Sequence, residues 1–312
     1  MAQWNITIQD YLNQERSLFE VVGVASSDGQ IISPQNPFPV TGTVGISSET
    51  LITINPDTNA VDAFGRSRVS ELFTLGDYKH LYAIDPNFLD SISGAGSTVA
   101  FLQNQACARL QTGIGSTAFS VHQTKFYHHY MPGKSQVIFS SINFGAATPN
   151  VVKRTGYFDD NDGIYFEQAG DGTLSWVIRS FVSGAPIEVR KTQSQWNLDT
   201  VSWLNILNTQ LVAIDFQWLG VGRVRVGFAH NGIVVYVHEF LHSNNLPTVY
   251  MSNPNLPIRC EIRNIGTTTG GSMDQICSTV FSEGGYVEAG QDWAATTPTL
   301  KVIDAGITAP VI

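Results

Sequence analysis

Charge is the scarcest property of this 312-residue sequence. Asp, Glu, Lys and Arg make up only 14% of it, whereas a typical soluble domain has about 25%. The formal net charge is −9. Binding along a phosphate backbone needs clustered Lys and Arg, so we expect no nucleic-acid partner. Charge is also depleted at the centres of protein interfaces, and a charge-poor chain therefore predicts burial against other subunits.

Cysteine and long apolar runs are also scarce. Cys107, Cys260 and Cys277 lie far apart and form no Cys-x-x-Cys pair, which excludes a zinc ribbon. We expect free thiols, although a Cys260–Cys277 disulfide stays open. No run reaches the roughly 20 apolar residues of a membrane span, and the opening residues lack the regions of a signal peptide. We therefore expect no membrane partner. The odd number of cysteines fits free thiols in a protein made in a reducing cytosol.

Signature motifs of enzymes are absent too. The sequence has no Gly-x-Ser-x-Gly elbow, no phosphate-binding loop and no dinucleotide fingerprint. On this ground we predict neither an enzyme nor a cofactor. Asp215, in the run LVAIDFQWLG, is the carboxylate nearest to an apolar setting. A glycosidase that uses Asp215 stays as a minor alternative.

Short strand-like runs and turn signals fill the region from about residue 97 onward. The runs are 118–130, 135–144, 152–158, 163–168, 173–182, 185–192, 210–218, 223–229, 233–240 and 257–265. Gly-containing turns, such as Pro132-Gly133, separate them. This pattern is typical of antiparallel sandwiches. We predict a mainly β protein, an antiparallel β-sandwich or jelly roll. The strands from 205 to 265 resemble lectin-type jelly rolls such as the concanavalin-like sandwich.

The clearest local pattern is a hairpin at residues 223–240, RVRVGFAHNGIVVYVHEF. Asn231-Gly232 suits a two-residue type I′ turn. Strict alternation then puts Val224, Val226, Phe228, His230, Ile233, Val235, Val237 and Glu239 on one face, toward a core. Tyr236 and Arg225 fall on a mixed opposite face, with Arg225 across from His238. His238 and His242 would point the same way only on a helix, so we expect no metal there.

The ends of the chain differ from its middle. Residues 1–60 carry β-prone runs cut by prolines, with a short amphipathic helix expected over residues 1–16. Such a stretch cannot build a core alone, so we predict an extended N-terminal arm at 1–60. We further predict a connecting strand and loop segment at 61–96, a β-sandwich body at 97–285 and a C-terminal extended tail at 286–312.

Two groups of residues are candidate ligand sites. Asp160, Asp162 and Glu167, in YFDDNDGIYFEQ, are candidates for a bound Ca²⁺. Glu167 follows Gly163 too closely for an EF-hand loop, and a plain hairpin turn explains the same letters. The candidates for sugar binding are Trp218, Arg225, Tyr236 and His238. We predict no resident metal and no catalytic residue.

Two blocks of the sequence resemble a known family. DAFGRSRVSELFTLGDYK, and YHHYMPGKSQVIFSSINFG followed by RTGYFDDNDGIYFE, are similar to virion structural proteins of large tailed bacteriophages of the marine and cyanobacterial type. The resemblance runs from about residue 60 to about residue 265. It departs at Ser67, where the family has Leu, and at Gly76, where the family has Phe. It implies a structural particle component with no activity to carry over.

The resulting expectation is a non-enzymatic structural component of a phage virion. It would form homo-oligomers, contact other virion proteins such as major capsid or tail proteins, and use its arms to add strands to the sheet edges of neighbouring copies. A capsid decoration or cement role and a tail or baseplate position both stay open. The alternative is a carbohydrate-binding or receptor-binding tail or baseplate protein, with a host surface glycan as its partner.

Overall fold

The computed structural model describes residues 3–9, 15–22, 61–69 and 71–285. Most of the expected N-terminal arm and the whole expected tail at 286–312 lie outside these residues. The chain divides into two compact units, residues 1–53 and 54–312. In the first unit, strands β1 (Gln3–Gln9) and β2 (Glu15–Val22) form an antiparallel hairpin. The helix predicted over residues 1–16 is therefore wrong. Ile6, Thr7 and Ile8 are three consecutive β-branched residues, which favour a strand.

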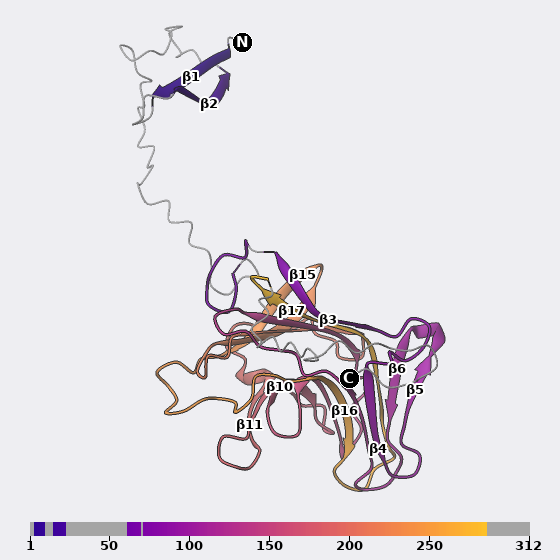
Figure 1. Ribbon diagram of the computed structural model, residues 1–312. Helices are drawn as coiled ribbons and strands as arrows, with labels where there is room; N and C mark the ends of the chain where they lie inside the picture. Colours follow the sequence, from indigo (N-terminus) through magenta and orange to yellow (C-terminus); the bar gives the residue numbers. More distant parts are fainter. Residues whose placement is uncertain (1–2, 10–14, 23–60, 70, 286–312) are drawn as a thin grey trace, which may run out of the picture. The chain divides into compact units, whose positions relative to one another are not determined.

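The second unit is a sandwich of two antiparallel sheets (Figure 1). The seven-stranded sheet has the order β12-β11-β10-β9-β16-β7-β4. Its strands are β4 (Phe88–Ser93), β7 (Phe119–Thr124), β9 (Val151–Phe158), β10 (Gly163–Gln168), β11 (Leu174–Ser180), β12 (Ile187–Thr192) and β16 (Ile258–Asn264).

The eight-stranded sheet has the order β15-β14-β13-β8-β17-β6-β5, with β3 paired to β17. Its strands are β3 (Leu72–Lys79), β5 (Thr98–Leu102), β6 (Cys107–Gln111), β8 (Gln136–Asn143), β13 (Gln210–Phe216), β14 (Val224–His230), β15 (Ile233–Phe240) and β17 (Ser272–Glu283). The described residues hold helical turns only at η1 (Gln103–Gln105) and η2 (Gln193–Gln195). None of the helices in this described part is long and apolar enough to cross a membrane.

The predicted antiparallel sandwich of concanavalin-like jelly-roll type is confirmed. Each of the ten predicted runs overlaps one strand, from β7 to β16 in chain order. The prediction gave no run for β5 and β6, and it missed β17, which pairs with β8, β6 and β3. It also placed residues 61–96 outside the body, whereas β3 and β4 are members of the two sheets. The sandwich therefore begins before residue 97.

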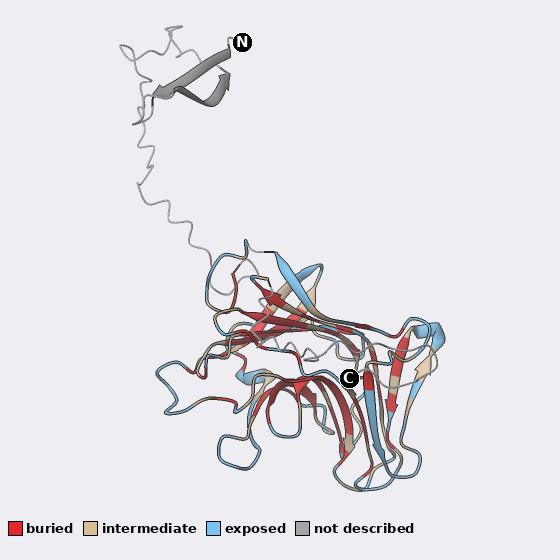
Figure 2. Ribbon diagram, in the orientation of Figure 1, coloured by how far each residue is buried: buried red, intermediate tan, exposed pale blue. Residues whose placement is uncertain are grey.

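The core lies between the two sheets, where Figure 2 shows the buried residues concentrated. Phe166 of β10 pairs with Trp176 of β11 on the inner face of the seven-stranded sheet. Phe228 of the opposite sheet meets the Phe166 ring edge-on, with ring centroids 5.0 Å apart. All three side chains are fully buried. Removing one such ring costs about 3–5 kcal/mol, so these contacts hold the two layers together.

A β-bulge changes the faces predicted for the hairpin β14–β15. The turn itself is as expected, with φ of 51° at Asn231 and 80° at Gly232. Beyond it, Gly227 pairs with Tyr236 while Val226 pairs with His238, so β15 carries one extra residue. The prediction that Arg225 faces His238 is wrong, since Arg225 lies opposite Glu239. An inserted residue reverses the sides of all residues beyond it.

Candidate functional site

An apolar slot opens at one edge of the sandwich. We call it the edge slot. It lies between the end strand of each sheet, β12 and β15, and the loop that follows β15. Its volume is about 740 Å³. Its apolar lining includes Ile178, Ile187, Val189, Phe240, Leu246 and Val249. Within the described residues, β12 pairs only with β11, so it presents a free backbone edge at the slot. The outer edge of β15 is occupied by residues 197–199, because the Val237 carbonyl accepts from the backbone N–H groups of Leu198 and Asp199, and the Glu239 N–H donates to the Asn197 side chain.

The slot is an uncovered part of the core. Val189 pairs with Ile178, and Ile178 belongs to the buried core cluster, so Val189 points toward the space between the sheets. Ile187 points the same way, two residues along. Yet Val189 is 50% exposed and Ile187 55% exposed. Apolar side chains that face inward and stay half-exposed indicate a place where the second layer is missing.

Two buried imidazoles lie at the slot without forming a metal site. His238 accepts a hydrogen bond from the backbone N–H of Asn197 at 3.2 Å. Burial, with Lys191 nearby, lowers the pKa of His238 to about 4. His242 donates from Nδ1 to the Gly222 carbonyl oxygen at 2.7 Å. Its ring also stacks on that of Tyr250, with ring centroids 4.1 Å apart. Burial also lowers the pKa of His242, so both imidazoles are neutral at pH 7.

The letters His238-Glu239-Phe240-Leu241-His242 match the zinc pattern His-Glu-x-x-His, which brings two imidazoles together on a helix. Here the segment is not helical, because His238 lies in strand β15, which ends at Phe240. The Phe240 ring centroid is 4.5 Å from that of His238 and 6.4 Å from that of His242. No group of three metal-binding side chains occurs within the described part of the chain.

The mixed face of the hairpin is covered by residues 61–68, which we call the anchor segment. Asp62 accepts hydrogen bonds from the backbone N–H groups of Phe64 and Arg66, both at 2.9 Å. Gly65 takes a φ of +77° in this turn, a conformation that favours glycine. The Asp-Ala-Phe-Gly-Arg block thus has a local structural role, as a turn that lies on the outer face of the eight-stranded sheet.

A buried charged cluster joins the anchor segment to the sheet. Arg68 and Arg225 both bind Asp215, and the Tyr236 hydroxyl donates to the same carboxylate at 2.9 Å. The Arg225 guanidinium lies over the Tyr236 ring, 4.3 Å from its centroid. Arg68 also lies 3.1 Å from Glu283. Burial and the Asp215 charge raise the pKa of Glu283 to about 7.

This cluster removes three sequence candidates from the surface. Asp215 and Arg225 have no exposed surface and Tyr236 only 5%. Asp215 is engaged by two guanidinium groups and a phenol, so the proposed catalytic use of Asp215 is wrong. Arg225 and Tyr236 cannot contact a sugar from beneath the anchor segment. The alternation that pointed to them was correct, but the sequence did not show what covers that face.

The remaining sugar candidates are separated. Trp218 packs partly against the core and donates from Nε1 to the Met251 carbonyl at 3.0 Å. His238 lies at the edge slot. The four residues Trp218, Arg225, Tyr236 and His238 therefore do not form one surface.

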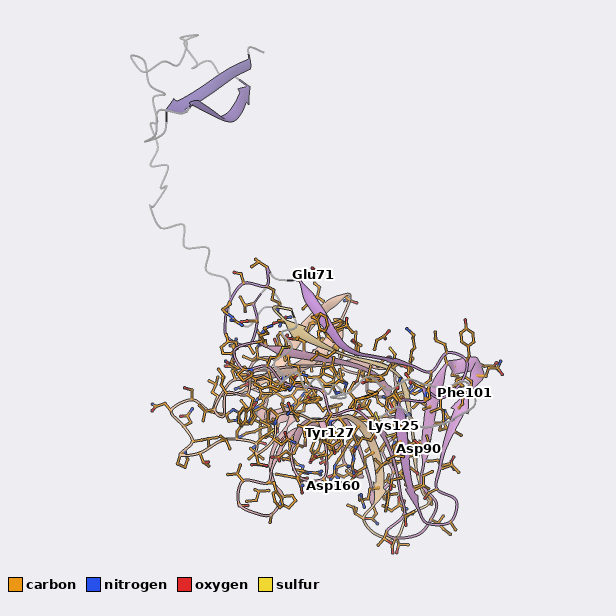
Figure 3. All side chains as sticks on the ribbon, viewed as in Figure 1. Glu71, Asp90, Phe101, Lys125, Tyr127 and Asp160 are labelled. Carbon is orange, nitrogen blue, oxygen red and sulfur yellow. The ribbon has the colours of Figure 1, made fainter. Side chains whose placement is uncertain are left out.

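The three calcium candidates are bound by protein groups at different places. Asp162 accepts from the backbone N–H groups of Phe181 and Ser252, at 3.1 and 2.8 Å. Asp160, labelled in Figure 3, is 81% exposed and pairs with Arg259. Glu167 is held by Arg154 and Arg190. The β9–β10 turn is capped instead by Asp159, which accepts from the backbone N–H groups of Asn161 and Asp162, so the Asp162 carboxylate joins this turn to two other loops.

Ion pairs cover the outer face of the seven-stranded sheet. Burial opposes ionisation of Glu261, but Arg259, Arg154 and Arg263 outweigh it and hold the pKa of Glu261 at about 2. Burial likewise opposes ionisation of Glu188, but its hydrogen bonds hold its pKa at about 2. These carboxylates stay ionised at neutral pH, and neither is protonated there to act as a general acid.

An aromatic hollow lies beside β3 and was missed by the sequence analysis. Its volume is about 520 Å³. Phe73, Phe126 and Tyr127, the last labelled in Figure 3, are 42%, 59% and 48% exposed in its wall. Asp77 and Asn87 add polar groups. The run KFYHH carries the signal, but its partners come from a strand some fifty residues earlier.

Comparison with known proteins gives a fold and no family. The sequence matches no protein-family model and no curated protein. The structure is similar to a β-1,3-glucanase from Mycobacterium marinum (11% identity, TM-score 0.44, 67% of this chain and 98% of that chain). It is similar to a glycosyl hydrolase family protein from Mycobacterium fortuitum (9%, 0.44, 67% and 98%). It is also similar to a legume lectin-like domain from Entamoeba histolytica (10%, 0.40, 68% and 98%).

The prediction that the chain is not an enzyme is corrected by this comparison, because a glucanase and a glycosyl hydrolase are among the structures it resembles. The prediction rested on the lack of signature motifs. Glycoside hydrolysis needs only two carboxyl groups at a set separation, and such a pair leaves no fixed spacing in a sequence. The fold therefore does not exclude catalysis.

Proposed function

We propose that this chain is a structural subunit of a tailed-bacteriophage virion, built into the particle through contacts between copies. The observation that carries the proposal is the edge slot, in which inward-facing apolar side chains stay half-exposed beside the free edge of β12. The charge-poor composition supports it, and so does the resemblance of residues 60–265 to phage virion proteins.

The energetics favour filling the slot. Burying a Val or Ile side chain completely contributes about 1.5–3 kcal/mol. Covering the exposed halves of Ile187 and Val189 would therefore contribute about 1 kcal/mol each. The free edge of β12 would gain hydrogen bonds from an added strand. Repeated over many copies, contacts of this size give a stable particle.

The direct test is the composition of particles of the phage that encodes the chain. The chain should band with purified particles in a density gradient, at a fixed ratio to the major capsid protein. Immunogold labelling would then distinguish a position on the capsid from one on the tail. A chain that is abundant in the lysate and missing from the banded particles would contradict the proposal.

A second candidate function is glycan binding at the aromatic hollow. Exposed aromatic rings next to carboxylate and amide groups suit a sugar, whose apolar face stacks while its hydroxyls hydrogen-bond. Phe126, Tyr127, Asp77 and Asn87 supply these groups. The lectin-like fold is compatible with such a partner.

The glycan candidate is tested on an array of host surface polysaccharides. Binding should be lost with Phe126→Ala and with Tyr127→Ala. It should persist with Ile265→Ala, which removes a side chain that is 63% exposed and does not line the hollow. Binding that survives both aromatic substitutions would rule the hollow out as the site.

A further inference from the structure

We propose that the edge slot receives residues Ile303–Val311 of a second copy of this chain, laid in as an extra strand. The inference rests on the proposed function, since it names the contact by which copies would join. It commits to one occupant because sequence pattern, slot chemistry and chain length agree on the same segment.

The sequence of the occupant alternates with the period of a strand. In IDAGITAPV, one face holds Ile303, Ala305, Ile307, Ala309 and Val311. The other face holds Asp304, Gly306, Thr308 and Pro310. Five apolar side chains in succession on one face suit a strand with one side buried. Pro310 is tolerated because a strand added at a sheet edge keeps some N–H groups free.

The slot offers what such a strand needs. Its walls are Ile187 and Val189 on one side, and Phe240 and Leu246 on the other. Within the described structure, β12 has a free edge with which an added strand can pair, whereas residues 197–199 already bond the outer edge of β15. An apolar side chain at every second position would continue the core, while the polar side chains would face water.

The chain is long enough to reach a neighbour. The end of β17, the last described strand, lies in register with the part of β15 that lines the slot. The register runs across the sheet from Ser282 in β17 to Phe240 in β15, through Gln136, Phe216 and Val224. Four strand spacings separate β17 from β15, about 19 Å in all. The 17 residues from 286 to 302 can extend over about 55 Å, well beyond the slot of their own copy.

The test is disulfide trapping in the full chain. The background carries Cys277→Ser, which removes the exposed native thiol and leaves the buried Cys107 and Cys260. Copies with Ala305→Cys are mixed with tagged copies that carry Ser183→Cys at the slot rim. We expect a disulfide between the two kinds of copy, about tenfold more abundant than random collision gives.

Matched controls separate docking from chance contact. Ser116→Cys replaces an exposed serine that does not line the slot, and it should give only the collision level. Ile303→Asp with Ile307→Asp should reduce the trapped product to that level. Thr308→Asp lies on the opposite face of the segment and should leave the product unchanged.

Two outcomes would overturn the inference. One is a disulfide with Ser183→Cys that is no more abundant than with Ser116→Cys. The other is a bond that forms only when both cysteines lie in the same chain, which would place the segment in its own slot. Trapping between copies of a chain that is missing from virions would instead refute the proposed function and leave the docking intact.

Discussion

At the residue scale, the structure depends on charge held out of water. Asp215 has no exposed surface, and Arg225, Arg68 and the Tyr236 hydroxyl satisfy it. A buried charge that loses its partner costs several kcal/mol. The anchor segment supplies one of those partners, so its attachment and the stability of the sheet depend on each other.

Arg68→Met should lower the free energy of unfolding by about 2–4 kcal/mol, because it leaves Asp215 and Glu283 short of a positive partner. The measurement is urea unfolding followed by tryptophan fluorescence. Arg66→Met is the matched control in the same segment. Arg66 is 55% exposed and pairs with Asp62, so its loss should cost less than about 1 kcal/mol. Equal losses for the two variants would contradict the role given to the cluster.

Glu283 predicts a dependence of stability on pH. Burial and Asp215 raise the pKa of Glu283 to about 7 in the folded chain, whereas an unfolded glutamate has a pKa of about 4.3. Between these values the folded state binds the extra proton, so stability falls as pH rises through this window. Glu283→Gln should remove this fall, raising stability at pH 8 by about 1–3 kcal/mol.

The measurement is the urea midpoint of both proteins at pH 5 and pH 8. The two should differ most at pH 8 and least at pH 5. A Glu283→Gln variant that is destabilised at pH 8 would show that the ionised carboxylate, through Arg68, stabilises the fold.

At the element scale, the bulge in β14–β15 depends on a glycine. Gly227 pairs with Tyr236 beside the extra residue Val237. A Cβ atom at residue 227 would lie 2.1 Å from the Val235 carbonyl oxygen. Backbone atoms cannot give way as a flexible side chain can, so only glycine fits the observed register.

Gly227→Ala should destabilise the chain by about 1–3 kcal/mol, the usual cost of overpacking. Gly115→Ala is the matched control, since its Cβ would meet nothing closer than 3.6 Å. The control should stay within about 0.5 kcal/mol of the parent. Differential scanning calorimetry measures both, and a Gly227→Ala variant as stable as the control would mean that the hairpin tolerates another register.

Most strands could be predicted because apolar and polar side chains alternate along them. Strand β17 could not, since Gln275, Ser278 and Ser282 lie among its buried positions and hide the period. The bulge in β14–β15 could not be predicted, because a single extra residue in a strand does not change the amino-acid composition. The N-terminal hairpin was predicted as a helix because residues 1–16 hold too few apolar side chains to distinguish the period of a helix from that of a strand.

At the scale of the whole molecule, the candidate site comes from distant parts of the chain. Val189, Phe240 and Leu246 meet only because β12 and β15 end their sheets on the same side. Sequence patterns report which residues face inward, not whether a second layer covers them. The edge slot therefore could not be predicted, although the addition of strands to sheet edges was part of the assembly hypothesis.

Val189→Lys should weaken association between copies while leaving the fold intact. The side chain is half-exposed, so a lysine can reach water, but it places a charge inside the slot. Sedimentation velocity over a concentration series should show a dissociation constant at least about tenfold higher, a change of about 1.4 kcal/mol. Ile265→Lys, at another exposed apolar position, should leave it unchanged. Identical sedimentation of the parent and Val189→Lys would remove the slot from assembly.

The anchor segment also decides how the body would carry a mechanical load. Residues 1–60 connect to the sandwich through Val61, whose carbonyl accepts from Arg225 and Arg68. Ala63 is tied to Ser135 of the body at 3.0 Å. Tension applied through residues 1–60 must break these side-chain bonds before it can peel β3 from β17. The bonds that Arg68 and Arg225 make to Val61 would therefore be among the first in the sandwich to bear the load.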